Sequence, residues 1–181
     1  MYLPFMKSTL RVFILGFFLS ACTEISYKEP QPTGIKVMKE VPAKLQGKYL
    51  VSDPEGDDVD TLSIYDNGYQ IGNDDKAGLG DSLVLKYYKG HYFVNMREDY
   101  AWYLRIVKRE KNGNLLYMEM EALPGEDEKK KNFIDRLSKD TPVIESQVED
   151  KTFYIIDPSP QKLMELIDKG YFKKQTFTRI K

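Results

Sequence analysis

The chain of 181 residues carries 27 basic and 28 acidic side chains, for a formal net charge of −1. These nearly equal numbers exclude the strongly basic composition that is typical of nucleic-acid-binding domains, and we expect no nucleic-acid partner. A single cysteine excludes an internal disulfide, and a single histidine excludes a zinc site built from a histidine cluster.

The N-terminal residues have the layout of a secretory signal. Two basic residues, Lys7 and Arg11, precede an apolar run over 12–19, and two small residues then stand directly before a cysteine. The run is too short for a membrane-spanning helix, which needs about 20 apolar residues. The remaining alternative is an ordinary signal peptide followed by an incidental thiol.

The stretch Leu19-Ser20-Ala21-Cys22 resembles the lipobox of bacterial lipoproteins. The resemblance implies that residues 1–21 are a signal peptide that is cleaved off, and that Cys22 then carries acyl chains that anchor the protein to a membrane. The mature chain would hold 25 basic and 28 acidic residues, a net charge of −3. Thr23 stands where some lipoproteins carry a sorting aspartate, so we expect a cell-envelope location at the outer membrane.

Composition divides the mature chain into two parts. Residues 22–42 contain three prolines and a glycine, with no apolar alternation long enough to form an element, so we expect a flexible, lipid-anchored tether. Residues 43–181 have the length of a single domain. A chain of this size can bury enough apolar surface to be stable without disulfides.

Short alternating runs separated by turn residues predict an antiparallel, mainly β domain with two helices, an α+β fold. Three pairs, Asn67-Gly68, Lys89-Gly90 and Asn112-Gly113, mark hairpins, because glycine and asparagine accept the positive φ of tight turns. The expected strands are 47–52, 61–65, 69–71, 82–88, 91–96, 101–108, 115–120, 143–148, 152–156 and 176–180.

Alternation also assigns the two faces of the predicted strands. In the strand over 101–108, the expected core residues share one side, and Arg105 lies on the other. An antiparallel sheet commonly packs one face and exposes the other to water, so we expect the face of Arg105 to be wetted. The expected core residues of this strand are Trp102, Leu104 and Ile106.

Two helices are expected, over 127–138 and from Pro160 to the residue before Gly170. Ser159 suits an N-cap, and Pro160 suits the first helical position, where its missing N–H has no partner to lose. If Gly170 ends the helix in a Schellman motif, Tyr171 packs back towards Leu166. The expected buried stripe of this helix is Leu163, Leu166 and Ile167.

The segment Leu45-Gln46-Gly47-Lys48-Tyr49 is similar to the Gly-x-Trp signature that opens the first strand of lipocalins and lipocalin-like barrels, with Tyr49 in place of the tryptophan. The late helix followed by a short final strand also resembles that family. The resemblance implies a closed barrel, and an open meander with helices packed on one face is the competing architecture. The chain also resembles small uncharacterised bacterial lipoproteins with a β-rich domain, which implies a location rather than an activity.

Catalytic motifs are not evident in the sequence. No glycine-rich phosphate loop follows a strand, and His91 stands beside a predicted turn, so we expect no enzymatic activity and no cofactor. A serine or carboxylate mechanism remains the enzymatic alternative. The acidic loop 53–60 lacks the ligand order of calcium loops, and we interpret it as a solvated loop. Its weak calcium candidates are Asp53, Asp57, Asp58 and Asp60.

Aromatic residues are dense over 87–103, and most of them suit packing within a sheet. Tyr87, Tyr88, Tyr92 and Tyr103 are our candidates for a ligand or partner surface, because flat amphipathic rings suit sugars, lipids and proteins. The leading hypothesis is a membrane-anchored, non-enzymatic module that binds a small apolar or glycan ligand. The alternative is a subunit that docks another envelope protein through an exposed aromatic face.

Overall fold

The computed structural model describes residues 25–52, 59–98, 100–120, 127–148 and 151–180. These residues form a mainly β, α+β fold, as the sequence predicted. The helices are α1 (Asp127–Ser138) and α2 (Pro160–Asp168). The strands are β1 (Ile25–Tyr27), β2 (Gly47–Ser52), β3 (Val59–Tyr65), β4 (Gly68–Ile71), β5 (Ala77–Gly78), β6 (Leu83–Tyr88), β7 (His91–Glu98), β8 (Ala101–Arg109), β9 (Leu115–Met120), β10 (Val143–Val148), β11 (Lys151–Ile156) and β12 (Phe172–Arg179).

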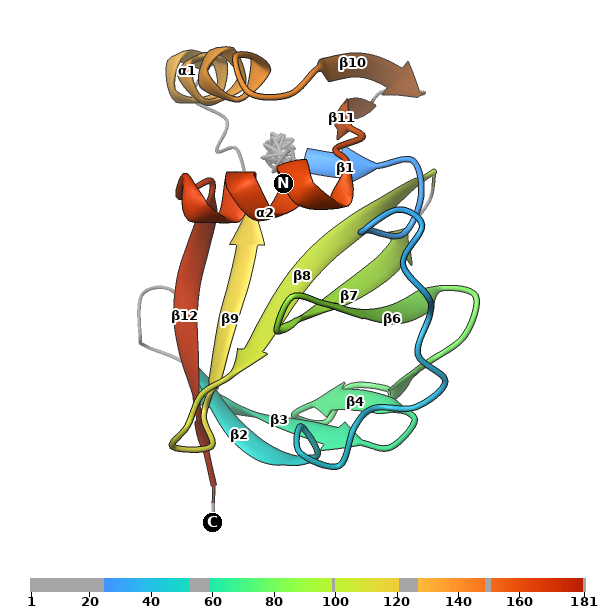
Figure 1. Ribbon diagram of the computed structural model, residues 1–181. Helices are drawn as coiled ribbons and strands as arrows, with labels where there is room; N and C mark the ends of the chain where they lie inside the picture. The colour runs from blue at the N-terminus through green and yellow to red at the C-terminus, as the bar shows by residue number, and fades with distance from the viewer. Residues whose placement is uncertain (1–24, 53–58, 99, 121–126, 149–150, 181) are drawn as a thin grey trace, which may run out of the picture.

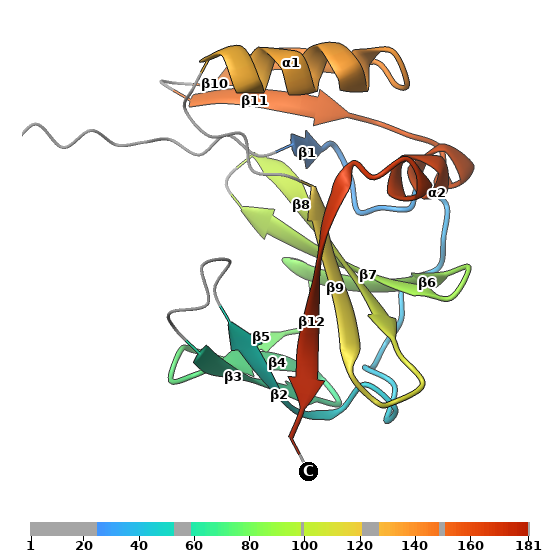
Figure 2. The same cartoon turned by 90° about the vertical axis from the view of Figure 1, so that its left-hand side faces the viewer.

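The strands are joined in one sheet with the order β10-β11-β1-β8-β9-β12-β2-β3-β4-β5, and β6 is attached through β7 to β8. β8 is therefore the junction: it pairs with β7 over Ala101–Val107 and with β9 over Arg105–Arg109, and it meets β1 where Tyr27 lies opposite Trp102. Figure 1 shows β8, β9 and β12 running from the helices at one end of the molecule to β2, β3 and β4 at the other. In the turned view of Figure 2, β2 to β5 bend away to one side of β12.

The sheet is not closed into a barrel, which corrects the architecture implied by the lipocalin resemblance. No ladder joins β5 to β6 within the described residues. The N-terminal segment connects β6 to the turn between β3 and β4 instead: the Met38 N–H donates to the Leu85 carbonyl of β6 at 2.8 Å, and the Val41 N–H donates to the Asp66 carbonyl of that turn at 2.7 Å. The signature residues do open β2, and Tyr49 is fully buried.

The segment expected to be a flexible tether is packed against the domain from Ile25 onward. This corrects the expected tether for residues 25–42, and with it the domain boundary at residue 43, while residues 22–24 lie outside the described residues. Residues 25–27 form the buried strand β1, which pairs in parallel with β11 and meets β8 on its other side. Residues 28–46, here called the strap, then pass along one side of the molecule beside β6 (Figure 1).

The strap is held in place because its backbone polar groups find partners in the sheet. The Nζ of Lys86 donates to the carbonyls of Pro30 and Pro32, at 2.7 and 2.9 Å. Asn95 accepts from the Gln31 N–H at 2.6 Å and donates to the Gln31 carbonyl at 2.8 Å. Lys86 and Asn95 are both buried. Prolines lack a backbone donor but keep a carbonyl acceptor, and Lys86 satisfies those of Pro30 and Pro32, while Asn95 satisfies both backbone groups of Gln31.

All three predicted hairpins are present. Asn67-Gly68 joins β3 to β4, Lys89-Gly90 joins β6 to β7, and the turn with Gly113 joins β8 to β9. Lys89 and Gly90 both have positive φ, 44° and 83°, as a two-residue hairpin turn requires. β12 begins at Phe172 rather than at residue 176, so the final strand is longer than expected, and β1 and β5 were not predicted.

Both helices occupy the predicted ranges. At α2, the Ser159 hydroxyl accepts from the Lys162 N–H, Pro160 is the first helical residue, and Gly170 has a φ of +76°. The Tyr171 N–H donates to the Leu166 carbonyl and the Gly170 N–H to the Ile167 carbonyl, so the predicted Schellman motif is confirmed. The three residues of the predicted apolar stripe are buried.

The two faces of the central strands pack against different partners. On one face, Leu104 and Ile106 of β8 join α1, α2 and β1 in a cluster here called the packed core. On the other face, Val107 of β8 and Leu115 of β9 belong to a second apolar cluster, which includes β2, β3 and the strap. The expected core residues of β8 are confirmed, but the opposite face is enclosed rather than simply wetted.

Candidate ligand cavity

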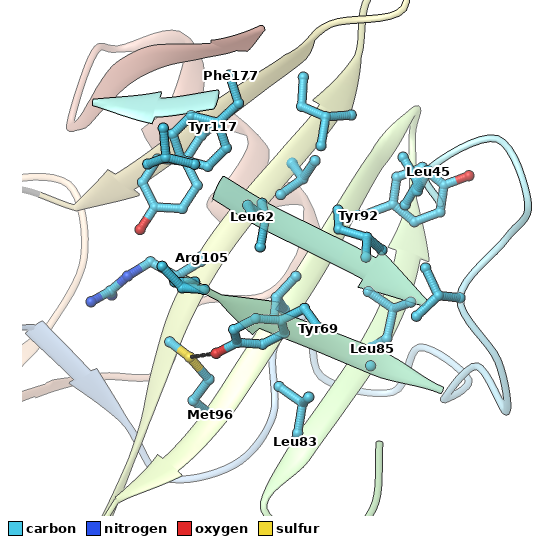
Figure 3. A pocket seen from close by; sticks show the side chains of 18 of the residues that line it. Leu45, Leu62, Tyr69, Leu83, Leu85, Tyr92, Met96, Arg105, Tyr117 and Phe177 are labelled. Atoms are coloured by element: carbon cyan, nitrogen blue, oxygen red, sulfur yellow. Dashed lines mark hydrogen bonds between the residues drawn. The ribbon is translucent and has the colours of Figure 1, made fainter. Parts of the chain in front are cut away.

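The second apolar cluster surrounds a cavity of about 370 Å³. Its walls come from the strap and from the strands β2, β3, β4, β6, β7, β8, β9 and β12 (Figure 3). Among the described lining residues, most are aliphatic or aromatic: Val41, Leu45, Val51, Leu62, Ile64, Tyr69, Ile71, Leu79, Leu83, Leu85, Tyr92, Val94, Met96, Val107, Leu115, Tyr117 and Phe177. This volume and lining are typical of pockets for small molecules.

Strand alternation explains how these residues reach the cavity. On β7, Tyr92, Val94 and Met96 are two residues apart and point to the same face. Tyr92 and Val94 are registered with the lining residues Val107 and Arg105 of β8. The strongly curved sheet places this face on its concave side, opposite β3 and β4, and neither α1 nor α2 lies between them (Figure 2).

Polar groups gather at one end of the cavity. Arg105 and Glu119 are cross-strand partners, and the Arg105 Nε lies 3.2 Å from the Glu119 Oε2. The Tyr117 hydroxyl donates to the same carboxylate at 2.8 Å. Figure 3 shows the Arg105 guanidinium and the Tyr117 hydroxyl on one side of the cavity, with Leu45 and Leu85 on the opposite side.

Two further groups lie towards the polar end. The Tyr69 hydroxyl donates to the Met96 sulfur at 3.4 Å, a contact drawn in Figure 3. Burial raises the pKa of Tyr69, and the positive charge of Arg105 opposes that shift, so this phenol is neutral at physiological pH. Gln175 also lines the cavity, and its side-chain amide donates to the Ser52 carbonyl.

The strap forms part of the cavity wall through Val41 and Leu45. Its attachment therefore decides whether the cavity is closed on that side. Burial lowers the pKa of Lys86, and the carboxylate of Glu29 opposes that shift. The ammonium is held by the two strap carbonyls despite its burial, since charge-assisted hydrogen bonds replace its water.

The structure separates the four tyrosines that were predicted to form a surface. Tyr87 and Tyr92 are cross-strand neighbours with ring centroids 4.8 Å apart, but Tyr92 is buried at the cavity while Tyr87 is 45% exposed. Tyr88 packs against the packed core on the opposite face. Tyr103 lies on the cavity face of β8, opposite Met96, and is half-buried.

The remaining sequence candidates lie outside the cavity or outside the described residues. Cys22 and three of the calcium candidates, Asp53, Asp57 and Asp58, are in the latter group. Asp60 is exposed on β3 and accepts from the Thr61 N–H, and the described residues contain no cluster that could hold a metal ion. His91 contacts the Lys89 carbonyl beside the hairpin turn, and burial lowers its pKa.

Sequence reasoning missed the cavity, although a signal was present. Residues 83–85 and 92–94 are apolar at consecutive positions, which indicates strands that are covered on both faces. Arg105 was placed on a wetted face, and neither Arg105 nor Glu119 was considered as a site residue.

Comparisons with protein-family models, curated proteins and solved structures found no match. No helix within the described ranges is both long and apolar enough to cross a membrane.

Proposed function

We propose that this protein is a non-enzymatic binding module that holds a small, predominantly apolar ligand in the cavity between β3, β4 and β7 to β9. The observation that carries the proposal is a partly open cavity of about 370 Å³ whose described walls are almost entirely apolar. Burial of apolar ligand surface there is favourable by about 25 cal/mol per Å². The apolar lining does not favour a glycan, because the glycan's hydroxyl groups would leave water and find no hydrogen-bonding partners among aliphatic side chains.

Docking of another protein through an aromatic face has weaker support. Of the four candidate tyrosines only Tyr87 belongs to the exposed class, and Tyr88 lies on the other face of the sheet. The exposed aromatic residue Tyr100 is remote in register from Tyr87, on the turn between β7 and β8.

The binding proposal can be tested with N-phenyl-1-naphthylamine, an uncharged apolar dye that fluoresces when it leaves water. We expect saturable binding to the purified protein. Val94→Trp puts a large ring into the cavity and should abolish most of that binding. Leu50→Trp is the matched control, because Leu50 is 42% exposed and does not line the cavity.

Native mass spectrometry of the protein purified from its own host gives an independent test. A bound small molecule that is absent from Val94→Trp would support the proposal. Dye binding that is unchanged in Val94→Trp, or a protein that neither carries a ligand nor binds the dye, would contradict it.

For location, we propose that Cys22 is acylated and anchors the protein in the cell envelope, at the outer membrane. The support is the lipobox-like stretch at Leu19-Ser20-Ala21-Cys22. Cys22→Ser should move the protein from the membrane fraction to the soluble fraction, with an unchanged circular dichroism spectrum. Retention of the variant on the membrane would refute the anchor.

A further inference from the structure

We propose that the ligand is a single-chain amphiphile with an uncharged polar head group, bound with its head at Arg105 and Glu119 and its chain towards Leu45 and Leu85. This inference rests on the proposed binding function and names the class and orientation of the ligand. The cavity volume of about 370 Å³ lies near the lower end of the range for ligand pockets, which favours one chain over two.

The orientation follows from the gradient of polarity along the cavity. One row of registered lining residues runs across the sheet from Glu119 and Arg105 through Val94 to Leu85, so it changes from charged on β9 and β8 to aliphatic on β7 and β6. In the next row the polar side chains, Tyr117 and Gln175, also lie on β9 and β12, and the row beyond it pairs Leu115 with Phe177. A head group placed at the far end would meet aliphatic walls, so its hydrogen-bonding groups would be buried without partners.

The preference for an uncharged head follows from the charge balance at the polar end. Among the described lining residues, Arg105 and Glu119 alone carry charges, and they compensate each other at 3.2 Å. Their side chains are 20% and 34% exposed, so both are largely withdrawn from water. Two exposed residues of opposite charge stand next to these lining residues without being part of the lining: Glu98 ends β7, two residues after Met96, and Lys173 is registered with Glu119.

An ionic head would disturb this balance. A ligand carboxylate on Arg105 would have to displace Glu119, which Tyr117 also holds. A ligand ammonium on Glu119 would add a second cation beside Arg105. Either case leaves one charge uncompensated in a partly desolvated site. A hydroxyl or amide can accept from the guanidinium or donate to the carboxylate while the ion pair remains intact.

The test compares three ligands with the same alkyl chain: dodecanol, dodecanoate and dodecylammonium. Each is titrated against N-phenyl-1-naphthylamine bound to the intact mature domain at neutral pH, with dodecanol kept below its solubility limit and the two ions below their micelle concentrations. We expect dodecanol to displace the dye at a concentration about tenfold lower than either ion, equivalent to about 1.4 kcal/mol. Equal potency of the three ligands, or a preference for either ion, would overturn the inference.

Two variants turn this comparison into a reciprocal test. Glu119→Gln leaves the positive charge of Arg105 uncompensated and should increase the affinity for dodecanoate by about tenfold relative to that for dodecanol. Arg105→Gln should do the same for dodecylammonium. Glu145→Gln, at an exposed position on β10, is the control and should change none of the three affinities.

The wild-type comparison needs no variant, so it stands if either substitution destabilises the fold. If both variants gained affinity for the same ion, that result would contradict the assigned head-group position. Failure of the dye and of all three ligands to bind refutes the proposed function itself, whereas binding without discrimination refutes only the head-group assignment.

Discussion

The two faces of β8 differ in packing: one contributes to the packed core, and the other lines the cavity. Leu104 and Ile106 are 3% and 0% exposed and pack against helices, whose side chains fill the space over the sheet. Arg105 and Val107 face the other way, towards a second layer made of strands and the strap. A helix laid on a sheet fills the gap with side chains, whereas the concave side of a bent sheet leaves space that only long side chains or a ligand can fill.

Truncation of a leucine on each side should give the largest contrast. Leu166→Ala removes a fully buried side chain of α2 from the packed core and should lower the free energy of unfolding by about 3–5 kcal/mol. Leu62→Ala, at the cavity wall, should lower it by about 1–2 kcal/mol, because its neighbours already face a void and lose fewer contacts. Urea denaturation measures both values.

Leu50→Ala, at an exposed position on β2, is the control and should change the free energy of unfolding by less than about 0.5 kcal/mol. Equal losses for Leu166→Ala and Leu62→Ala would show that the cavity side is as tightly packed as the helical side.

The attachment of the strap gives the next largest expected effect. Asn95→Ala removes two hydrogen bonds to the backbone of Gln31 and leaves those buried groups unsatisfied. We expect a loss of about 1–3 kcal/mol in the free energy of unfolding and faster proteolytic cleavage within residues 28–46. Asn112→Ala, in the exposed β8–β9 turn, serves as the control for proteolysis. Cleavage of the strap at the wild-type rate would show that Asn95 does not hold it.

The smallest expected effect is a pH dependence on the helical side. The ammonium of Lys169 and the hydroxyl of Tyr171 donate to Asp140, and these hydrogen bonds hold its pKa below the usual 3.8. In the folded state the carboxyl therefore binds fewer protons than in the unfolded state between its lowered pKa and 3.8. Its stabilising contribution is present above pH 3.8 and is lost as the pH falls through the folded-state pKa.

Asp140→Asn should therefore flatten the acid limb of the stability curve and leave its shape near neutral pH unchanged. Urea denaturation at a series of pH values measures this. A variant whose acid limb keeps the wild-type slope would rule out a contribution from this carboxyl. The effect belongs to the packed core, because Tyr171 is part of it and Asp140 is not near the cavity lining.

Structural features that depend on residues close together in the sequence could be predicted, whereas features that depend on residues far apart could not. The caps of α2 and the three hairpins were predictable because Ser159, Pro160, Gly170 and the turn glycines act within a few residues. The strap was not, because the groups that order it, Lys86 and Asn95, are more than fifty residues away from their partners. The cavity was missed for a related reason, since the curvature of the sheet decides whether the face of Arg105 meets water or β3.

The position of β1 has a consequence for the order of folding. Its three residues lie between β8 and β11, and Ile25 is registered with Tyr154, so two segments more than a hundred residues apart in the chain pair with each other. β2 is likewise paired with β12 at Leu50 and Thr178. Loops of this length are entropically costly to close, and contacts so distant in sequence slow folding. The hairpins β6–β7 and β8–β9 can form early, but the sheet can be completed only after almost the whole chain is available.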